Sequence, residues 1–375
     1  MSEIIIKEVA SKKEMKKFIE FPIKLYKGNP YFVPPLYGDE LKLFGETNPY
    51  NNISKTVFYL AYRDGKIVGR LSGILQYQYN EKNNDKTVRF TRFDVIDDLE
   101  VSKALFAKLF EWTKEQGMEN VRGPLDYNDL GREGLLIEGF DQLSTFEEQY
   151  NYSYYKDHLE AIGFEKDVDW LEFKIRPPKN GNSLLKKVGD KALKMNNLHF
   201  ASQKMSKKEY IARYRDGFFH CLDECYSHLY GTVDIDKKSQ DSLVDQFIQI
   251  VNIKYLVFIV NEKDEVVAFA LCFPSMSEVF QGTDGKLTLG RIIKLLHAVN
   301  HPKVIDFGLI GVLPEYQGAG LNAALMSRLM EGLDDGIDHG ETNLNLETNT
   351  QVLAQWRYFS SENHKRRRSF VYHIK

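Results

Sequence analysis

The strongest constraint on the fold is an order of predicted elements that occurs twice along the chain. Each half is predicted to run strand, helix or helices, hairpin, strand, helix, strand, helix, strand. The two hairpins turn at Asp64-Gly65 and at residues 262–264, because short polar turns between β-rich runs are typical of hairpins. Any α/β chain alternates in this way, but the matching places of the hairpin and the last helix–strand pair favour two tandem domains. We therefore predict a mixed α/β (α+β) protein in which each half has a mixed central sheet flanked by helices.

A proline- and glycine-rich stretch separates the two halves. Residues 176–182 read Arg-Pro-Pro-Lys-Asn-Gly-Asn, a composition typical of linkers. We predict a first domain at 1–176, a linker at 177–196 and a second domain at 197–375. A length of 375 residues suits two domains of roughly 150 residues each.

Composition excludes several classes of protein. Lys and Arg total 50 against 53 Asp and Glu, which gives no general attraction to nucleic acid or to an acidic membrane. No run approaches the roughly 18 apolar residues of a membrane helix, and the first residues do not resemble a signal peptide. We predict a cytoplasmic protein without a nucleic-acid or membrane partner. The cysteines, Cys221, Cys225 and Cys272, are expected to be small buried thiols, and no metal site is predicted.

The segment Ile310–Met326 carries the chemistry. An apolar run leads into a glycine-rich turn, which opens directly into a helical pattern. Gly318 and Gly320 remove side chains where a backbone must approach a ligand closely. The first turn of a helix presents unpaired N–H groups and a positive dipole potential. The segment therefore predicts a site for a pyrophosphate-like anion, although a glycine-rich turn alone is weak evidence.

This segment resembles the coenzyme A motif of the GNAT acetyltransferases, V-x-P-x-x-Q/R-x-x-G-x-G/A. Val312, Pro314, Gln317 and Gly320 match, whereas Asn322 stands at the last position in place of Gly or Ala. The resemblance implies acetyl-CoA or another acyl-CoA as co-substrate, and a V-shaped cleft between two splayed strands that holds the pantetheine arm. The cofactor-binding residues that it implies are Ile310, Gly311, Val312, Gln317, Gly318, Ala319, Gly320, Leu321, Asn322 and Asn349.

The first half is similar to a large bacterial subgroup of tandem GNAT-like proteins. Residues 29–36, 121–124 and 134–141 carry that resemblance. The corresponding strand-to-helix loop, Asp94–Ser102, has no glycine and three aspartates. Carboxylates repel phosphate, so we expect this half to be a degenerate domain that does not hold coenzyme A.

The resemblance also implies catalytic roles. Many GNAT enzymes have a glutamate base where this chain has Gly308, so Asp306, Glu347 or a relayed water could take the proton from the acceptor amine. Tyr358 is the candidate acid for the leaving thiolate, although it lies two residues beyond the usual spacing from Asn349. A strand-edge carboxylate and core aromatic packing are the alternatives. A backbone N–H near Ile310 or Val312 would meet the acyl oxygen.

Two further predictions concern regions outside the motif. The basic cluster His364–Arg368 is expected in a turn before a last strand at 369–374, either as a solvated loop or in contact with the 3′-phosphate or an acidic acceptor. The substrate pocket is expected between the halves, where loops 29–36 and 124–155 would contact the acceptor. Tyr152, Tyr154 and Tyr155 are candidate lining residues or core residues.

The function predicted on this basis is direct transfer of an acyl group from acyl-CoA, with acetyl-CoA as the expected donor, to an amine of a small molecule or peptide. A non-catalytic acyl-CoA-binding or scaffold protein is one alternative. A tandem-GNAT enzyme that transfers aminoacyl or long-chain acyl groups is another. The sequence determines neither the acceptor and chain length nor the oligomeric state.

Overall fold

The computed structural model describes residues 2–43, 45–46, 48–176, 183–248, 250–333 and 336–374. Most of the expected linker motif, residues 177–182, lies outside the described residues. The remainder of the predicted linker is not extended, because Ser183–Met195 forms helix α6. None of the described helices combines the length and apolar character needed to cross a bilayer.

The first half contains these helices and strands: β1 (Ile4–Glu8), α1 (Lys12–Leu25), α2 (Tyr37–Leu43), β2 (Ser54–Arg63), β3 (Lys66–Gln76), α3 (Tyr77–Asn83), β4 (Thr87–Val95), α4 (Leu99–Glu115), β5 (Asn120–Gly123), β6 (Leu135–Glu138), α5 (Tyr154–Ile162) and β7 (Glu165–Arg176). The second half contains these: α6 (Ser183–Met195), β8 (His199–Phe200), α7 (Lys207–Tyr226), α8 (Lys237–Phe247), β9 (Leu256–Val260), β10 (Val266–Pro274), α9 (Ser277–Phe280), α10 (Leu289–Asn300), β11 (Val304–Val312), α11 (Leu321–Gly332), β12 (His339–Thr342), β13 (Asn345–Leu346), α12 (Thr350–Leu353) and β14 (Ser360–His373). Short 3-10 turns lie at Pro49–Asn52, Ile253–Tyr255, Pro314–Tyr316 and Ala354–Tyr358.

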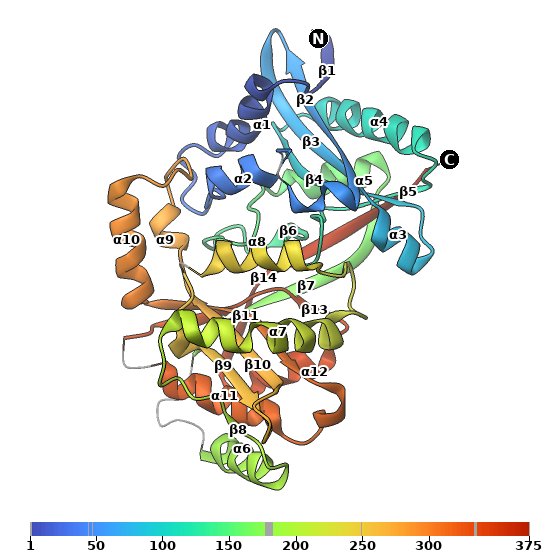
Figure 1. Ribbon diagram of the computed structural model, residues 1–375. Helices are drawn as coiled ribbons and strands as arrows, with labels where there is room; N and C mark the ends of the chain where they lie inside the picture. Colours follow the sequence, from blue (N-terminus) through green and yellow to red (C-terminus); the bar gives the residue numbers. More distant parts are fainter. Residues whose placement is uncertain are drawn as a thin grey trace.

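One sheet runs through the whole molecule (Figure 1). Its order is β1-β2-β3-β4-β5-β14-β7-β12-β11-β10-β9-β8, with β6 beside β14 and β13 beside β7. The two ends of the sheet repeat one pattern: antiparallel strands followed by a parallel pair, β4 with β5 and β11 with β12. The predicted mixed α/β architecture, with two similar halves, is confirmed.

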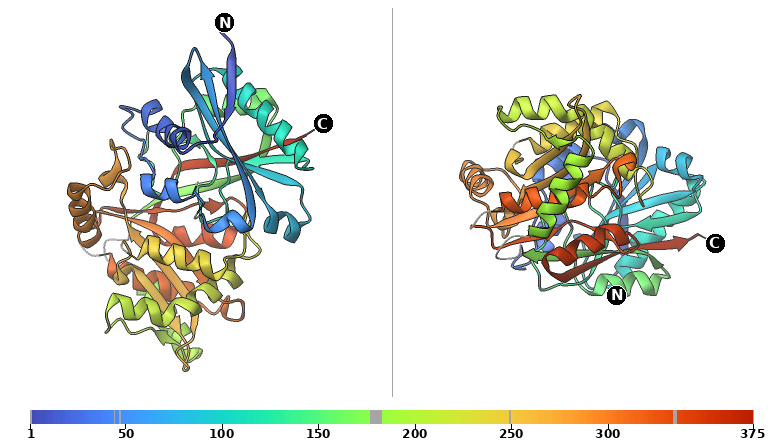
Figure 2. Two further views of the ribbon diagram at one scale, coloured as in Figure 1. Left: turned by 45° about the horizontal axis from the view of Figure 1, so that its top comes forward. Right: turned by 90° about the horizontal axis from the view of Figure 1, so that it is seen from below.

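The last strands of the two halves are exchanged. β14, the C-terminal strand, pairs with β5 of the first half, while β7 pairs with β12 of the second. β14 and β7 also pair with each other along most of their length. Phe370 of β14 is buried in the core of the first half, and Ile175 of β7 is buried in the core of the second. Figure 2 shows the C-terminal end of the chain among strands of the first half. A division by sequence at residue 176 is therefore not a division of the sheet.

The basic cluster His364–Arg368 lies inside β14, which begins nine residues before the predicted start. The expectation of a solvated turn is therefore wrong. The side chains of Lys365 and Arg367 are fully buried, and each pairs with Glu172, at 3.1 and 2.7 Å. Side chains alternate across a strand, so Arg368 faces the other side, where it pairs with Asp169. The cluster stabilises the centre of the sheet, and its two buried members lie among partners within the protein.

Candidate functional site

The two parallel strands of the second half separate as they leave the sheet centre. β11 and β12 pair only from Val304 with His339 to Phe307 with Thr342. Beyond that point the chain after β12 turns away and forms β13, which pairs with β7. Among the residues that the structure describes, no strand pairs with residues 308–312 on their β12 side. The V-shaped cleft implied by the family resemblance is confirmed.

The glycine-rich turn lies at the end of this cleft. Gly318 and Gly320 have φ of 78° and 90°, a left-handed conformation that glycine adopts without strain. Gly320 is the N-cap of α11 and provides no side-chain cap. The side chain of Gln317 donates through Nε2 to the carbonyl oxygen of Val312 at 3.3 Å, which ties the turn to the strand. The first N–H groups of α11 therefore point toward the turn without an internal acceptor from the N-cap side chain.

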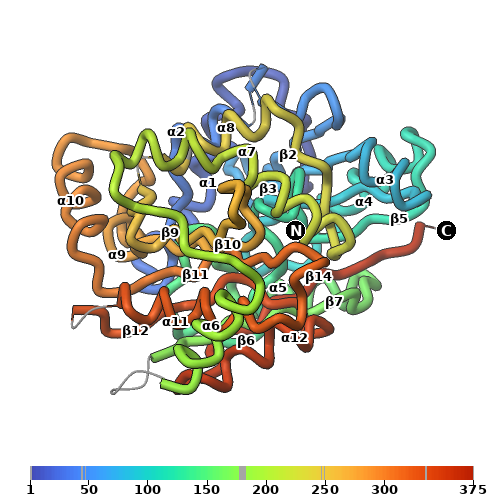
Figure 3. Tube along the Cα trace, turned by 60° about the horizontal axis from the view of Figure 1, so that its bottom comes forward, coloured from blue at the N-terminus to red at the C-terminus, as the bar shows by residue number. Residues whose placement is uncertain are grey.

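Helix α6 packs against this turn and against α11 (Figure 3). A Cβ atom at residue 320 would lie 3.3 Å from Ala192 Cβ and 3.4 Å from Val188 Cγ1, whereas a Cβ at Gly318 meets nothing within 4 Å. Gly320 is thus held by packing within the protein. Gly318 is the glycine that faces open space, so it is the position at which a phosphate can approach the backbone.

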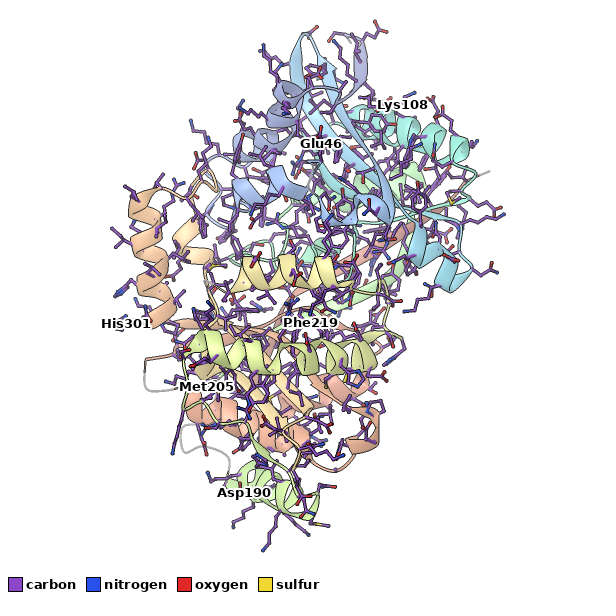
Figure 4. All side chains as sticks on the ribbon, viewed as in Figure 1. Glu46, Lys108, Asp190, Met205, Phe219 and His301 are labelled. Carbon is purple, nitrogen blue, oxygen red and sulfur yellow. The ribbon has the colours of Figure 1, made fainter. Side chains whose placement is uncertain are left out.

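A cavity of about 770 Å³ opens from the cleft toward the first half. One wall is apolar and comes mainly from α7, α8 and the segment after α8; Phe219, labelled in Figure 4, lies between these helices. The apolar residues of this wall are Ile211, Phe218, Phe219, Leu222, Leu243, Val244, Phe247, Ile248 and Val251. The opposite wall is acidic and combines loop 129–148 of the first half with β11 and β12; its carboxylates are Asp129, Glu133, Glu147, Glu148, Asp306 and Glu341.

A tandem GNAT protein from the clavulanic acid biosynthesis pathway has the same arrangement of two halves. It matches this chain with a TM-score of 0.55, covering 100% of this chain and 99% of its own, at 12% sequence identity. The chain has a tandem GNAT fold. A GCN5-related N-acetyltransferase from Sphaerobacter thermophilus is also similar, with a TM-score of 0.52, 10% identity and coverage of 99% and 96% of the two chains.

Sequence comparison finds two curated relatives of this tandem GNAT chain. Protein YghO of Escherichia coli (strain K12) is 27% identical and covers 98% of this chain and 94% of its own length. A bacterial ceramide synthase of Caulobacter vibrioides (strain NA1000 / CB15N) is 25% identical over 175 residues, which is 46% of each protein. No protein-family model matches the chain.

The acidic wall holds carboxyl groups whose protonation is strongly perturbed. Asp306 is buried on β11, and its Oδ1 atom has no hydrogen-bond partner among the described residues. Burial raises the pKa of Asp306 well above its usual value, and the nearby carboxylates of Glu147 and Glu341 raise it further. Burial also raises the pKa of Glu148 to about 8 and that of Asp129 to about 6. At neutral pH Asp306 and Glu148 therefore favour the protonated form, and a cation that enters the cavity would favour their ionised form.

Glu341 differs from its neighbours because a cation lies beside it. Lys365 Nζ is 3.0 Å from Glu341 Oε2. Burial opposes ionisation of Glu341, but Lys365, His339 and His364 together outweigh it and lower the pKa overall. Glu341 therefore stays ionised near Asp306, which strengthens the affinity of Asp306 for a proton. No group of three or more potential metal ligands occurs among the described residues.

Tyr226, at the end of α7, was not predicted from the sequence and occupies the centre of the cleft. Its hydroxyl donates to the carbonyl oxygen of Ile310 at 3.1 Å and accepts from the N–H of Ile310 at 3.2 Å. These are the backbone groups on the open edge of β11, where the GNAT motif suggested an oxyanion donor. Burial raises the pKa of this hydroxyl, so it stays protonated. Nothing in the local sequence around Tyr226 distinguishes it from a core tyrosine.

Only one of the three predicted catalytic side chains lines the cavity, and it is Asp306. Glu347 accepts a hydrogen bond from the N–H of Asp169 at 3.1 Å and pairs with Lys166 at 2.8 Å, outside the cavity lining. Tyr358 is partly exposed, and its hydroxyl accepts from Arg357 at 3.1 Å. Trp356, which stands at the usual family position, lies in the wall instead.

The predicted cofactor residues fall into four groups. Ile310, Gln317 and Asn349 line the cavity, and Asn349 also caps α12 by accepting from the N–H of Val352 at 3.2 Å. The glycine-rich turn itself consists of Gly318, Ala319 and Gly320. Gly311, Val312 and Leu321 face the core, while Asn322 is exposed on the first turn of α11.

The expectation of a pocket wall from the first half holds for loop 124–155 but not for its tyrosines. Loop residues from Asp129 to Glu148 line the cavity. Tyr155 accepts from the N–H of Val95 at 2.9 Å, and Tyr154 donates to the carbonyl oxygen of Val95 at 2.7 Å. Both rings, together with Tyr152, belong to the core of the first half.

Proposed function

We propose that the protein is an acyl-CoA-dependent N-acyltransferase whose amine acceptor binds in the cavity between the two halves. The observation that supports this proposal is that one cavity brings together the open edge of β11, the start of the glycine-rich turn and several acidic side chains. The open edge of β11 and Gln317, which leads into the glycine-rich turn, lie at one end of the cavity, and an acidic wall lines it as well. An amine arrives at neutral pH as a cation and favours the ionised form of the carboxyl groups whose pKa values are raised. Once ionised, such a carboxylate can accept the proton of the amine.

The acyl-CoA would lie along the open edge of β11. The N–H groups of Gly318 and Gly320 and of the first turn of α11 suit its pyrophosphate. The backbone of residues 308–312 suits the amides of the pantetheine arm, which would pair like an added strand once the hydroxyl of Tyr226 moves away from the backbone of Ile310. The thioester would then lie near Ile310.

Proton transfer would use two groups that face this point. The bound ammonium favours the ionised form of Asp306, which releases its own proton to solvent as the amine enters. The carboxylate then accepts a proton from the ammonium, and the freed amine nitrogen attacks the thioester carbon. The carbonyl oxygen becomes negatively charged and is stabilised by a backbone N–H of β11. As the C–S bond breaks, the nitrogen releases its second proton to solvent, the coenzyme A thiolate takes a proton from the hydroxyl of Tyr226, and solvent restores the proton of Tyr226. The products are an amide and free coenzyme A.

The acyl chain, the amine or both would be long and apolar. A cavity of about 770 Å³ lies in the ~300–1,000 Å³ range of sites for ligands of drug size, far larger than an acetyl group needs. The wall from α7 and α8 is mostly apolar, with Arg215 and Tyr226 of α7 as polar exceptions. The relative from Caulobacter is a ceramide synthase, and a ceramide is an amide of a long-chain amino alcohol. We therefore propose a long-chain substrate in place of the acetyl group expected from the motif alone.

The test is a matrix of donors and acceptors with the full-length protein. Acyl-CoAs from acetyl to palmitoyl are paired with polyamines, amino acids and long-chain amines, and amide product is identified by mass spectrometry while free thiol is measured. We expect turnover only with pairs in which at least one partner has a long alkyl chain. Tight binding of acyl-CoA without turnover in any pair would favour the scaffold alternative. Turnover restricted to acetyl-CoA with a short amine would overturn the assignment of chain length.

A further inference from the structure

Helix α10 presents an apolar stripe to solvent. Leu289, Ile292, Ile293 and Leu296 are 83, 37, 69 and 50% exposed. Their spacing of i, i+3, i+4 and i+7 places all four on one face of the helix. Leu287, just before the helix, is 51% exposed and adds to the same segment. Exposed apolar residues scattered singly are ordinary, but a contiguous stripe marks an interaction surface.

A stripe of basic residues lies beside the apolar one. Lys294, His297 and His301 follow the spacing i, i+3 and i+7 and are all exposed. His301 is labelled at the outer edge of the molecule in Figure 4. The sequence from Lys286 to Lys303 contains no Asp or Glu. The exposed surface of α10 is therefore apolar and basic, with no acidic residue on the helix.

The third face of α10 fixes the helix to the protein body. Val299 is buried, Leu295 is half-buried, and the carbonyl oxygen of Val299 accepts from Asn252 Nδ2 at 3.5 Å. Asn252 directly follows Val251, a residue of the cavity wall. The segment before the helix is held as well, because Tyr37 N–H donates to the carbonyl oxygen of Gly285 at 3.0 Å. The apolar stripe thus has a fixed orientation and lies close to the apolar end of the cavity.

We infer that α10 docks the protein on the surface of an anionic phospholipid bilayer. A helix with an apolar stripe, a flanking basic stripe and no acidic residue suits the boundary between acyl chains and anionic headgroups.

A second copy of the chain fits this surface less well than a bilayer does. A two-fold contact would place this patch against itself, and α10 offers no acidic side chain to pair with the cations. The inference replaces the expectation of no membrane partner and does not depend on the transfer reaction. It also gives long-chain substrates a short route from the bilayer to the cavity wall.

Vesicle binding by the full-length protein tests this inference. Flotation is compared between phosphatidylglycerol-containing vesicles and pure phosphatidylcholine vesicles at low and high salt. We expect binding to the anionic vesicles that weakens with salt, and a loss of about tenfold or more in the double variant L289Q/I293Q. Both positions are highly exposed, so the fold does not depend on them. K294Q should weaken binding about fivefold on anionic vesicles and little on neutral ones.

The matched control places the same change on another exposed apolar pair. Leu184 and Met195 on α6 are 63 and 72% exposed, and L184Q/M195Q should bind vesicles as the wild type does. Equal losses in the two double variants would overturn the role of α10. So would a wild-type protein that ignores both kinds of vesicle. Conversion of a dimer to a monomer by L289Q/I293Q, without vesicle binding by the wild type, would assign the stripe to a second copy instead.

Discussion

The two halves share one fold but differ at the strand-to-helix turn and at the strand edge beside it. In the first half the helix α4 carries its own anion, because the Asp98 carboxylate caps the N–H of Glu100 and pairs with Arg63 at 2.5 Å. In the second half Gly320 caps α11 without a side chain. The same backbone position thus accepts an internal carboxylate in one half and is left for an external anion in the other.

The edges of β4 and β11, the strands before these two turns, differ as well: side chains occupy the first and a cavity lies beside the second. On β4, Tyr154 and Tyr155 bond the backbone of Val95, and the neighbouring Asp94 is locked by Arg70 at 2.7 Å. On β11, a single hydroxyl, that of Tyr226, bonds the backbone of Ile310, and the space beyond it is a cavity. A few side chains therefore distinguish the two copies of the fold: they occupy the strand edge of the first half, whereas a cavity lies beside that of the second, and the first half supplies one wall of this cavity.

The largest expected effect comes from removing the Asp306 carboxylate on β11. Asp306→Asn should lower kcat/KM by about 100-fold, because the amide cannot take a proton from the acceptor ammonium. Glu347→Gln is the control and should stay within about twofold, since Glu347 lies outside the cavity lining and is tied to Lys166. Steady-state rates with the best substrate pair measure both. Equal losses would return Glu347 to the active site.

A charge at Gly318 tests whether the glycine-rich turn binds the pyrophosphate. Asp and Asn both tolerate a left-handed backbone, and neither meets a protein atom there. Gly318→Asp should weaken coenzyme A binding roughly 10- to 100-fold through repulsion, whereas Gly318→Asn should weaken it only slightly. Calorimetric titration of the full-length protein measures the Kd. Similar values for the two variants would place the phosphates elsewhere.

The two candidate tyrosines of the second half can be separated by hydroxyl removal. Tyr226→Phe should lower kcat about tenfold with little change in the Kd of acyl-CoA, because only a proton donor is lost. Tyr358→Phe should leave kcat unchanged. If Tyr358→Phe slows the reaction and Tyr226→Phe does not, the proton donor is Tyr358, as the family resemblance suggested.

The corresponding change in the first half should affect stability alone. Tyr155→Phe leaves the buried N–H of Val95 without its acceptor, at a cost of ~1–2 kcal/mol in the free energy of unfolding. Urea denaturation measures that loss. Coenzyme A affinity should not change, and a weakened affinity would mean that the first half contributes to the cofactor site.

The smallest expected effect is the pH dependence contributed by the acidic wall. Glu148 has a pKa of about 8 in the folded chain, raised by burial, and a lower pKa when unfolded. The unfolded state therefore loses this proton first, and stability falls as pH rises from about 5 to 8. Glu148→Gln should make that fall shallower, and the exposed control Glu262→Gln should not. A steeper fall in Glu148→Gln than in the wild type would contradict the raised pKa.

The sequence predicts features that are encoded locally. The turn at Gly318–Gly320 follows from a contiguous motif, and the splay of β11 from β12 is implied by the family that this motif resembles. The expectation that the aspartates at 94–98 keep coenzyme A from the first half stays a prediction. The acidic wall and Tyr226 could not be predicted in this way. Their partners lie far along the chain, and a carboxylate in a loop has the same local sequence whether it is solvated or buried.

The basic cluster His364–Arg368 also shows that a local sequence does not reveal whether charged side chains are buried. Four consecutive cations normally indicate a solvated segment, yet Lys365 and Arg367 are buried because Glu172 lies opposite them on a strand almost 200 residues earlier. Only the pairing of β14 with β7 reveals that neutralisation. Long-range registry of this kind leaves no periodic signal in a single sequence.

The exchanged strands bear on how the chain is made in the cell. During synthesis the first half emerges with β5 lacking its neighbour, because that neighbour, β14, is made after all the other strands of both halves. The first half cannot complete its sheet until β14 has been made, and a chain that stops before Ser360 exposes the edges of both β5 and β7. Unpaired edges recruit other strands, so a prematurely terminated product would aggregate. For the same reason, after a gene duplication neither copy could later be lost or moved to a separate gene without disrupting the sheet of the other.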